Sequence, residues 1–196
     1  MICDDNSVTG LISSTYPHID HHQYDQYYLD HTIFSGKNSD VEDINSEVLQ
    51  RCPGEKKVMQ SADSVMSNDE NVNDLTLYSM EYLNSLRASS LPLTKLALKI
   101  GVRVILLRNL DTTKGLCNRT RMIVTHISTR VLRCRIISGD AKFAGSIVLI
   151  PRINMDVSVE DLPILLNRRQ FPVELAFAMT INKSQGQSVK HVGLDL

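Results

Sequence analysis

A polar string near the end of the sequence, FAMTINKSQGQS, carries the side chains best suited to chemistry. Thr180 offers a hydroxyl, Asn182 an amide and Lys183 an ammonium group, and Gln185 and Gly186 follow with a second amide and open backbone. Because the string lies between two apolar runs, we expect these groups at the edge of a sheet. Such donors at a sheet edge suit the recognition of phosphate, although an ordinary loop between strands is the alternative.

The segments around this string predict the elements that position it. Residues 173–180 and 189–196 form two compact apolar runs, and the chain stops within the second, which predicts that the sequence ends before its domain does. Residues 151–172 are interrupted by prolines and are expected to be irregular. Residues 1–30 mix Asp, His and Tyr with few aliphatic side chains and are expected to form a peripheral lead-in.

The acidic half of the chain predicts the start of an α/β unit. A short β-like run at residues 31–34 precedes a helix expected over residues 40–50, where Ser39 and Glu42 have the spacing of a capping box. A second β-like run is expected at residues 57–60. Further on, apolar residues between Leu75 and Leu86 recur at helical intervals and predict a helix that packs against the sheet.

From residue 91 the pattern changes to short strands with tight turns. Alternating apolar and polar residues predict five strands within sixty residues, which favours a small antiparallel barrel. The expected strands are 95–100, 102–106, 121–127, 130–137 and 146–150. Arginines at polar positions of these strands, which include Arg103 and Arg121, are expected to form a basic outer face.

The net charge of −1 hides a division between the two halves. Residues 1–90 carry five Lys or Arg against fifteen Asp or Glu, a net charge of −10, whereas residues 91–196 carry sixteen against seven, a net charge of +9. Such asymmetry indicates either a polyanionic partner for the basic half or mutual attraction of the halves.

The four cysteines lack CxxC spacing, and neither a secretory signal nor a membrane span is visible, so an intracellular protein is expected.

Metal and thiol chemistry are not expected. Histidines and aspartates cluster between residues 18 and 31, but no cysteine or distant ligand completes a metal-binding set, so exposed polar side chains are the preferred interpretation. Cys117 and Cys134 are expected to be core thiols, because nothing near them in the sequence marks an activated nucleophile.

Three segments in the same order resemble Pif-one-like DNA helicases of superfamily one, particularly those carried by Helitron transposons. FAMTINKSQGQ resembles helicase motif V, FSGKNSDVEDINSEVL resembles a motif of domain 2A with the pattern N, two residues, V, two residues, I-N, and LKIGVRVILLRNLDTTKGLCNRTRMIV resembles the start of the 2B barrel. The resemblance implies a partial RecA-like P-loop NTPase second domain, 2A, at residues 31–90 and 151–196. It implies an inserted Src-homology-three-like barrel, 2B, at residues 91–150.

The resemblance implies part of a five-prime to three-prime helicase that uses ATP and magnesium to unwind single-stranded or forked DNA in the nucleus, with family roles in repair, recombination and telomere maintenance. The chain carries no GxxxxGK[ST] loop, no paired Asp-Glu after an apolar strand and no final arginine motif. The first RecA-like domain is missing from this sequence, and hydrolysis of ATP by the chain alone is not expected. Whether the chain is part of an active enzyme is left open.

The resemblance also assigns roles to particular residues. Those implied to contact DNA or to couple it to the nucleotide are Thr180, Asn182, Lys183, Lys37, Asn38, Arg103, Arg108 and Arg121, and those implied to lie near the nucleotide are Gln185, Gly186 and Gln187. For the barrel arginines, a merely solvated face is the alternative. FSGKN departs from the family's usual T-P-K-N. GLCNRTR departs from the family's GLCNGTR, so Arg119 replaces a glycine that readily takes a positive φ, at a cost of roughly 1 kcal/mol if that backbone is retained.

A second hypothesis is a non-enzymatic nucleic-acid-binding module in which the basic barrel acts alone, or an inert fragment derived from a transposon. Its motivation is the charge of the basic half without an ATPase motif. With few aromatic residues after residue 90, contact with nucleic acid there must depend on phosphates.

Overall fold

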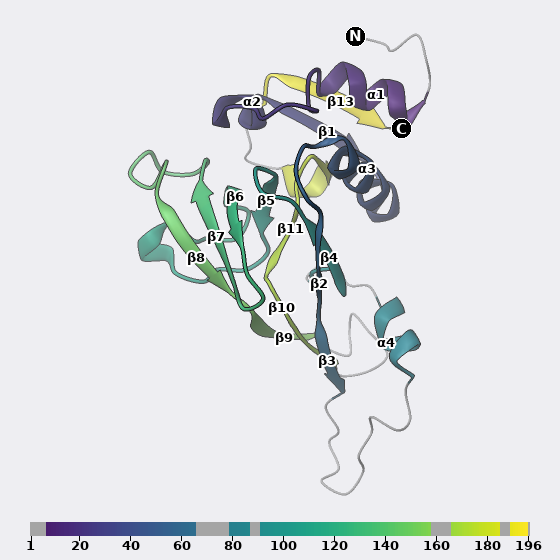
Figure 1. Ribbon diagram of the computed structural model, residues 1–196, viewed down its shortest axis with the longest axis vertical. Coiled ribbons are helices and arrows are strands. Elements are labelled where there is room, and N and C mark those ends of the chain that lie inside the picture. The colour runs from purple at the N-terminus through teal and green to yellow at the C-terminus, as the bar shows by residue number, and fades with distance from the viewer. Residues whose placement is uncertain (1–6, 66–78, 87–90, 158–165, 185–188, 196) are drawn as a thin grey trace, which may run out of the picture.

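The computed structural model describes residues 7–65, 79–86, 91–157, 166–184 and 189–195. Figure 1 shows a small parallel sheet flanked by helices near the N-terminus, with a larger antiparallel sheet beside it. Among the described residues, no helix is long and apolar enough to cross a membrane.

The parallel sheet joins segments from the two ends of the chain. Its order is β12-β1-β13, from β12 (Ala178–Thr180), β1 (His31–Ser35) and β13 (His191–Asp195). Helix α1 (Val8–Thr15) packs on β13, and α3 (Asn38–Arg51) packs on β12. The strands expected at residues 31–34 and within 189–196 are therefore confirmed.

Helix α3 confirms the helix expected over residues 40–50, but its start differs from the prediction. The N-cap residue is Lys37, which caps with no side-chain hydrogen bond, and Ser39 already lies in the first turn. There its hydroxyl donates to Asp40 at 2.9 Å. The predicted capping box of Ser39 and Glu42 is therefore wrong, because the helix begins one residue before the serine.

The peripheral position predicted for residues 1–30 is wrong over the part that the structure describes. Helix α1 and helix α2 (Asp25–Asp30) bring apolar and aromatic side chains into the main core, namely Ile12, Tyr16, Ile19, Tyr27 and Tyr28. The Tyr16 hydroxyl donates to the carbonyls of Phe177 and His31, and its burial raises the pKa of the phenol. Tyrosine can be buried in this way because its hydroxyl finds a partner, which a count of aliphatic residues does not anticipate.

The antiparallel sheet has five strands in the order β11-β5-β6-β7-β8. They are β11 (Val173–Leu175), β5 (Arg103–Leu106), β6 (Arg121–Ile127), β7 (Val131–Ile136) and β8 (Ile147–Pro151). One continuous set of buried side chains runs from the parallel sheet into this one. The prediction of an α/β domain with a small all-β barrel is confirmed.

The composition of the barrel differs from the prediction in one strand. The first expected strand, β4 (Lys95–Leu98), pairs with β2 (Lys57–Gln60) in a separate two-stranded sheet. Its place beside β5 is taken by β11, which pairs with β5 in antiparallel register. Pairing partners this far apart in sequence leave no local signal, so alternation predicts each strand without predicting its neighbour.

The irregular segment predicted at residues 151–172 also contains strands. β9 (Ile153–Val157) and β10 (Leu166–Gln170) pair with each other, and β10 pairs with β3 (Ala62–Val65). Arg168 on β10 and Asp63 on β3 form a buried ion pair with a 2.7 Å contact. The sequence did not predict these strands because they are polar, and charged residues at core positions break the expected alternation of apolar and polar residues.

The helix predicted between Leu75 and Leu86 is confirmed over α4 (Met80–Ser85), and residues 75–78 lie outside the described residues.

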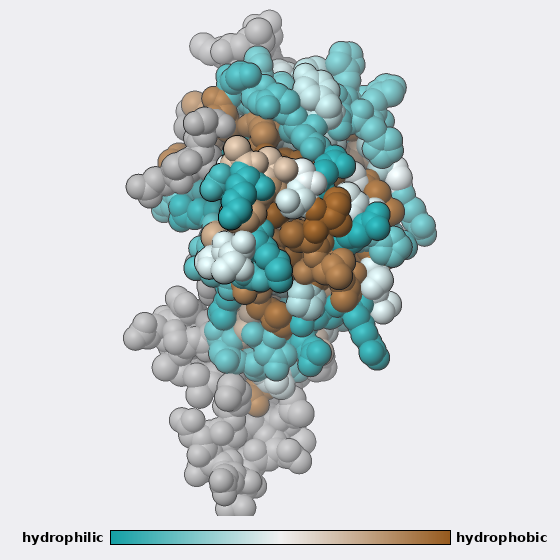
Figure 2. Space-filling model, turned by 90° about the vertical axis from the view of Figure 1, so that its left-hand side faces the viewer, coloured by the Kyte–Doolittle hydropathy of each residue, from teal (hydrophilic) through white to brown (hydrophobic). Residues whose placement is uncertain are grey.

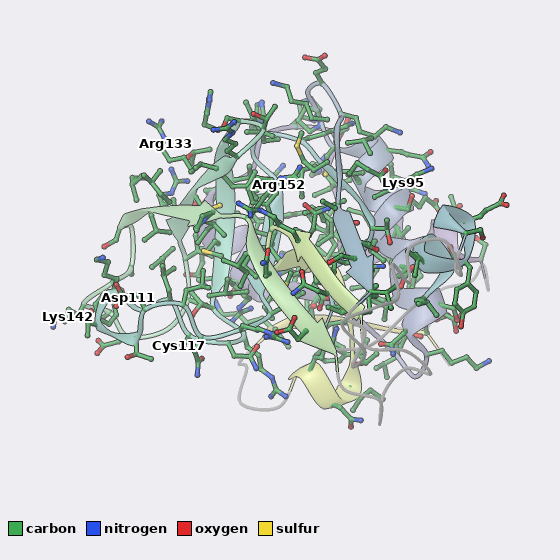
Figure 3. The ribbon with its side chains drawn as sticks, turned by 90° about the horizontal axis from the view of Figure 1, so that it is seen from below. Lys95, Asp111, Cys117, Arg133, Lys142 and Arg152 are labelled. Carbon is green, nitrogen blue, oxygen red and sulfur yellow. The ribbon has the colours of Figure 1, made fainter. Side chains whose placement is uncertain are left out.

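The outer face of the barrel is less basic than predicted. Edge strand β8 exposes Ile147 and Leu149 to 53% and 63%, on a side of the molecule where Figure 2 shows an apolar patch. Figure 3 shows Arg133 projecting away from the barrel loops that carry Asp111, Cys117 and Lys142.

Candidate nucleic-acid interface

Two motifs more than 140 residues apart in sequence meet at one edge of the parallel sheet. β1 and β12 are parallel, and their last residues, Ser35 and Thr180, are partners in the register. Lys37 and Asn38 follow the first strand, and Asn182 follows the second in the 3-10 helix η3 (Ile181–Ser184). The carboxyl ends of adjacent parallel strands are where ligands bind in open α/β sheets.

A buried asparagine of α3 holds the motif V strand in place. The Asn45 side chain donates to the carbonyl of Ala178 at 3.0 Å and accepts from the Ala178 N–H at 2.9 Å. β12 is an edge strand, so this side chain satisfies backbone groups that would otherwise lack a strand partner. Asn45 lies within the motif of domain 2A, but its role cannot be read from the sequence alone, since the contact is made across 133 residues.

A groove of about 540 Å³ lies between this edge and the barrel. Its walls come from three segments that the sequence had singled out separately, together with the end of β5. The polar lining residues are Asn38, Asn118, Arg119, Glu174, Thr180, Asn182 and Lys183. The groove thus gathers hydroxyl, amide and cationic groups, the set that phosphate recognition requires.

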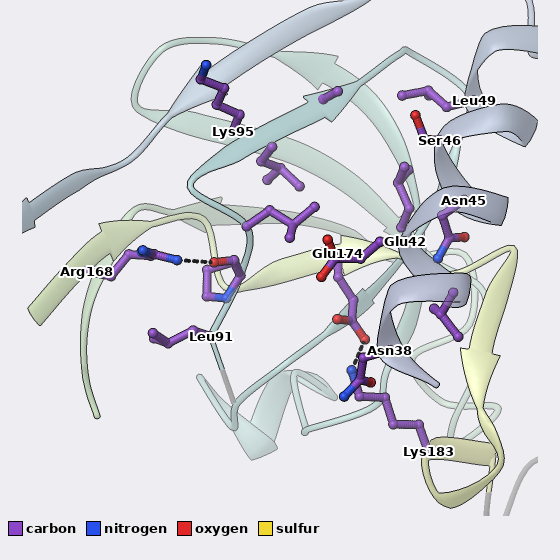
Figure 4. Close-up of a pocket in the computed structure, with 16 residues that line it drawn as sticks. Asn38, Glu42, Asn45, Ser46, Leu49, Leu91, Lys95, Arg168, Glu174 and Lys183 are labelled. Atoms are coloured by element: carbon purple, nitrogen blue, oxygen red, sulfur yellow. Dashed lines mark hydrogen bonds and ion pairs between the residues drawn. The ribbon is translucent and has the colours of Figure 1, made fainter. Parts of the chain in front are cut away.

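Lys183 enters the groove already paired. Its ammonium lies 2.7 Å from Glu174 Oε1, and both side chains are about three-quarters buried. Figure 4 shows Glu174 extending toward Lys183, with Asn38 beside the pair. The positive charge of Lys183 is therefore largely compensated within the protein.

A second cavity, of about 240 Å³, adjoins the groove and shares Asn38, Glu174 and Lys183 with it. Its remaining lining comes from α3, the segment 91–97, Leu175 and Arg168. Figure 4 shows Glu42 and Asn45 facing this cavity from α3, with Lys95 at a distance from the ion pair. The lining mixes apolar side chains with both signs of charge.

The structure brings together part of the predicted site. Thr180, Asn182, Lys183 and Asn38 line the groove. Lys37 is exposed at the start of α3 but is not among the lining residues. Gln185, Gly186 and Gln187 lie outside the described residues.

The solvent-exposed positions predicted for Arg103 and Arg121 are wrong. Arg103 has no exposed surface, and its guanidinium donates to the carbonyls of Tyr28, His31 and Ala176 and to the Tyr16 hydroxyl. A side chain enclosed in this way is not available to DNA in this conformation.

Arg121 is buried too, where it donates to the carbonyl of Leu29 at 3.3 Å. Burial, followed by the neighbouring positive charge of Arg103, lowers the pKa of Arg121 to about 10. Arg108 is half-buried outside the groove lining and donates to the carbonyl of Asp156 at 3.1 Å. Arginine was assigned to the outer face because alternation marks polar positions, but these guanidinium groups satisfy buried carbonyls instead.

Of the two predicted core thiols, Cys134 is buried, and burial raises the pKa of its thiol to about 12. Cys117 is only half-buried. Cys52, which the sequence analysis did not single out, is buried as well, and desolvation likewise raises the pKa of its thiol to about 12. Raised values keep both buried thiols protonated and unreactive at neutral pH.

The site thus consists of a small parallel sheet with flanking helices, a compact antiparallel barrel and a polar groove between them. Residues 81–127 match the family model of the DNA helicase Pif1 2B domain. The chain is 26% identical over 195 residues to the ATP-dependent DNA helicase PIF1 of Xenopus laevis, covering 99% of this chain and 27% of the relative. It is 29% identical over 186 residues to ATP-dependent DNA helicase Pif1 of Campylobacter jejuni, covering 91% of this chain and 39% of the relative.

The solved structures agree on the fold. A crystal structure of Bacteroides Pif1 bound to single-stranded DNA superposes with a TM-score of 0.55 at 20% identity, covering 84% of this chain and 40% of the other. The chain is thus similar over most of its length to Pif1 helicases, which supports the resemblance to Pif-one-like helicases inferred from its motifs. It spans well under half the length of the relatives and of the solved chain named here.

Proposed function

We propose that this chain supplies single-stranded DNA contacts to a Pif1-like helicase through the groove between the parallel sheet and the barrel. The observation that carries the proposal is the convergence of Asn38, Thr180 and Asn182 in one groove lining, from segments far apart in sequence. Amide and hydroxyl donors at the carboxyl ends of parallel strands fit the oxygens of a phosphate backbone. The Bacteroides relative bound to single-stranded DNA supports the same ligand class.

The motor activity of the whole protein is proposed on the family relationship. We infer a five-prime to three-prime DNA helicase that uses ATP with magnesium, works on forked as well as single-stranded DNA, and requires a first RecA-like domain that this sequence does not contain. Motif V, which continues into residues 185–187, would couple DNA contact to the nucleotide. A nuclear location with roles in repair, recombination and telomere maintenance is proposed on the same basis, as is the Helitron origin.

Binding of labelled single-stranded oligothymidine, followed by fluorescence anisotropy at low salt, tests the groove. Asn182→Ala removes an exposed amide from the lining and is expected to weaken binding about fivefold, since the net contribution of a typical hydrogen bond is on the order of 1 kcal/mol. Asn154→Ala is the matched control, because Asn154 is also exposed but lies on β9, outside the lining. Equal affinity of the two variants would contradict the proposed site.

The module hypothesis predicts the same DNA binding without any link to ATP hydrolysis. The helicase and module hypotheses can be distinguished by joining the chain to the first RecA-like domain of a Pif1 relative. Phosphate release is then measured with and without single-stranded DNA. Stimulation that is lost in Asn182→Ala supports the helicase. Hydrolysis that DNA does not change would favour the module.

A further inference from the structure

Arg119 stands in the loop between the 3-10 helix η2 (Thr112–Lys114) and β6, where the resembled family pattern has glycine. Its φ of 70° lies in the left-handed region, so the backbone that suits glycine is retained with an arginine in place. The side chain is exposed and lines the groove together with its neighbour Asn118. Arg119 is therefore a cationic side chain within the lining of the proposed DNA site.

The loop that carries Arg119 is tied to the end of β5. The Arg119 N–H donates to the Leu106 carbonyl at 2.8 Å, and the Leu106 N–H donates to the Thr120 carbonyl at 3.0 Å. The Thr120 hydroxyl in turn donates to the Gly115 carbonyl and accepts from the Cys117 N–H. These bonds fix the backbone on both sides of Arg119, so its side chain leaves the groove wall from a defined point.

The other charged residues of the groove show why the positive charge of Arg119 could matter for binding. The ionisable lining residues are Arg119, Lys183 and Glu174, and the last two form an ion pair. Among the described residues, no carboxylate forms an ion pair with Arg119. The uncompensated positive charge of the groove is therefore that of Arg119.

We propose that Arg119 is a phosphate-binding residue of the groove, which provides the charged contact that Lys183 could provide only by leaving Glu174. The proposal rests on the proposed function of the groove. A guanidinium presents paired N–H donors that match two phosphate oxygens, and it stays charged at any physiological pH. Arginine at this position thus supplies an anion-binding group at a cost in backbone strain, because its φ is positive.

Salt titration of oligothymidine binding, followed by anisotropy, tests this with Arg119→Gly and Arg119→Lys. Arg119→Gly is expected to weaken binding about fivefold at low salt and to reduce the slope of log affinity against log salt by about 0.7, the value for one contact to a single strand. Arg119→Lys should keep the slope. The same Arg119→Gly variant should unfold at a higher urea concentration than the wild-type chain, because glycine relieves the left-handed strain.

The expected fall in affinity together with a rise in the urea midpoint distinguishes a DNA contact from a structural role. Damage to the fold would lower both the affinity and the urea midpoint. Arg130→Gly is the charge-matched control, because Arg130 is an exposed arginine in the β6–β7 turn, outside the groove lining. If Arg119→Gly leaves affinity and slope unchanged while Asn182→Ala weakens binding, the role of Arg119 is refuted and the groove stands. If the wild-type chain binds no DNA, the proposed function fails and this proposal with it.

Discussion

At the scale of single residues, the groove is governed by the balance between Lys183 and Glu174. The pair is a partly buried salt bridge at 2.7 Å, in which the carboxylate faces the same space that a phosphate would occupy. A phosphate near this space is attracted by Lys183 and repelled by Glu174, and the two effects largely cancel at similar distances. In the proposed DNA site, the carboxylate of Glu174 would therefore lower the affinity for phosphate while it pairs with Lys183.

Glu174→Gln is expected to strengthen binding of oligothymidine about threefold to tenfold at low salt, because it removes one negative charge while leaving a carbonyl oxygen for Lys183. The gain should disappear toward molar salt, where charge interactions are screened. Anisotropy across a salt series measures it. Glu55→Gln, which neutralises an exposed glutamate outside the groove, is the control, and a variant of Glu174 that binds more weakly than the wild type would contradict the argument.

At the scale of elements, the contacts that position the groove are made by polar side chains across long sequence separations. Asn45 joins α3 to β12, and Arg103 joins β5 to the segments around β1 and β11. Removing either one leaves buried backbone groups unpaired, which is costlier than the net value of the bonds themselves. These two side chains therefore hold the two walls of the groove in register.

Asn45→Ala is expected to lower the free energy of unfolding by about 2–3 kcal/mol, since the N–H and carbonyl of Ala178 both lose their partner. Because Thr180 ends the same strand and Asn182 follows it in η3, affinity for oligothymidine should fall in the folded variant as well. Urea denaturation and anisotropy measure the two effects. Ser46→Ala, at an exposed position next along α3, should change neither, and an Asn45→Ala variant with wild-type affinity would show that the contact does not position the site.

Arg103→Ala is expected to destabilise the fold by about 3 kcal/mol or more, because several buried carbonyls lose their donor together. Arg133→Ala is the control: Arg133 is exposed on β7, so its loss should change stability by less than about 0.5 kcal/mol. Urea denaturation of both variants gives the comparison. Similar free energies of unfolding for the two variants would mean that the hydrogen bonds of Arg103 do not stabilise the contact between the sheets.

The same contacts explain what the sequence could and could not predict. Local alternation and helical spacing predicted β1, α3 and the central barrel strands, because those patterns depend on neighbours in sequence. The motifs predicted Asn38, Thr180, Asn182 and Lys183, which the groove brings together. Arg103 was misplaced because alternation marks a polar position without showing that carbonyls from distant segments surround it.

At the scale of the whole molecule, the division of charge serves partly to join the two halves. Within the described residues, three ion pairs cross the boundary at residue 90, between Arg135 and Asp25, Lys190 and Asp30, and Arg168 and Asp63. Mutual attraction of the halves is thus realised alongside whatever the basic half offers to DNA. The first two pairs are partly exposed and contribute little to stability, so the shared apolar core must provide most of the coupling.

This shared core predicts that the barrel does not fold as an independent module. Residues 91–157 alone would lose β11, the edge partner of β5. Arg103 would also lose the Tyr28 carbonyl, the Tyr16 hydroxyl and the Phe177 ring that surround its guanidinium. A domain of about sixty residues buries only about 60% of the surface that its unfolded chain exposes, less than a larger domain does. A further loss of contacts should therefore leave this segment without a cooperative urea transition by circular dichroism, while the whole chain unfolds cooperatively. A cooperative transition in residues 91–157 would restore the hypothesis of a barrel acting alone, whereas its absence would mean that DNA binding requires both walls of the groove.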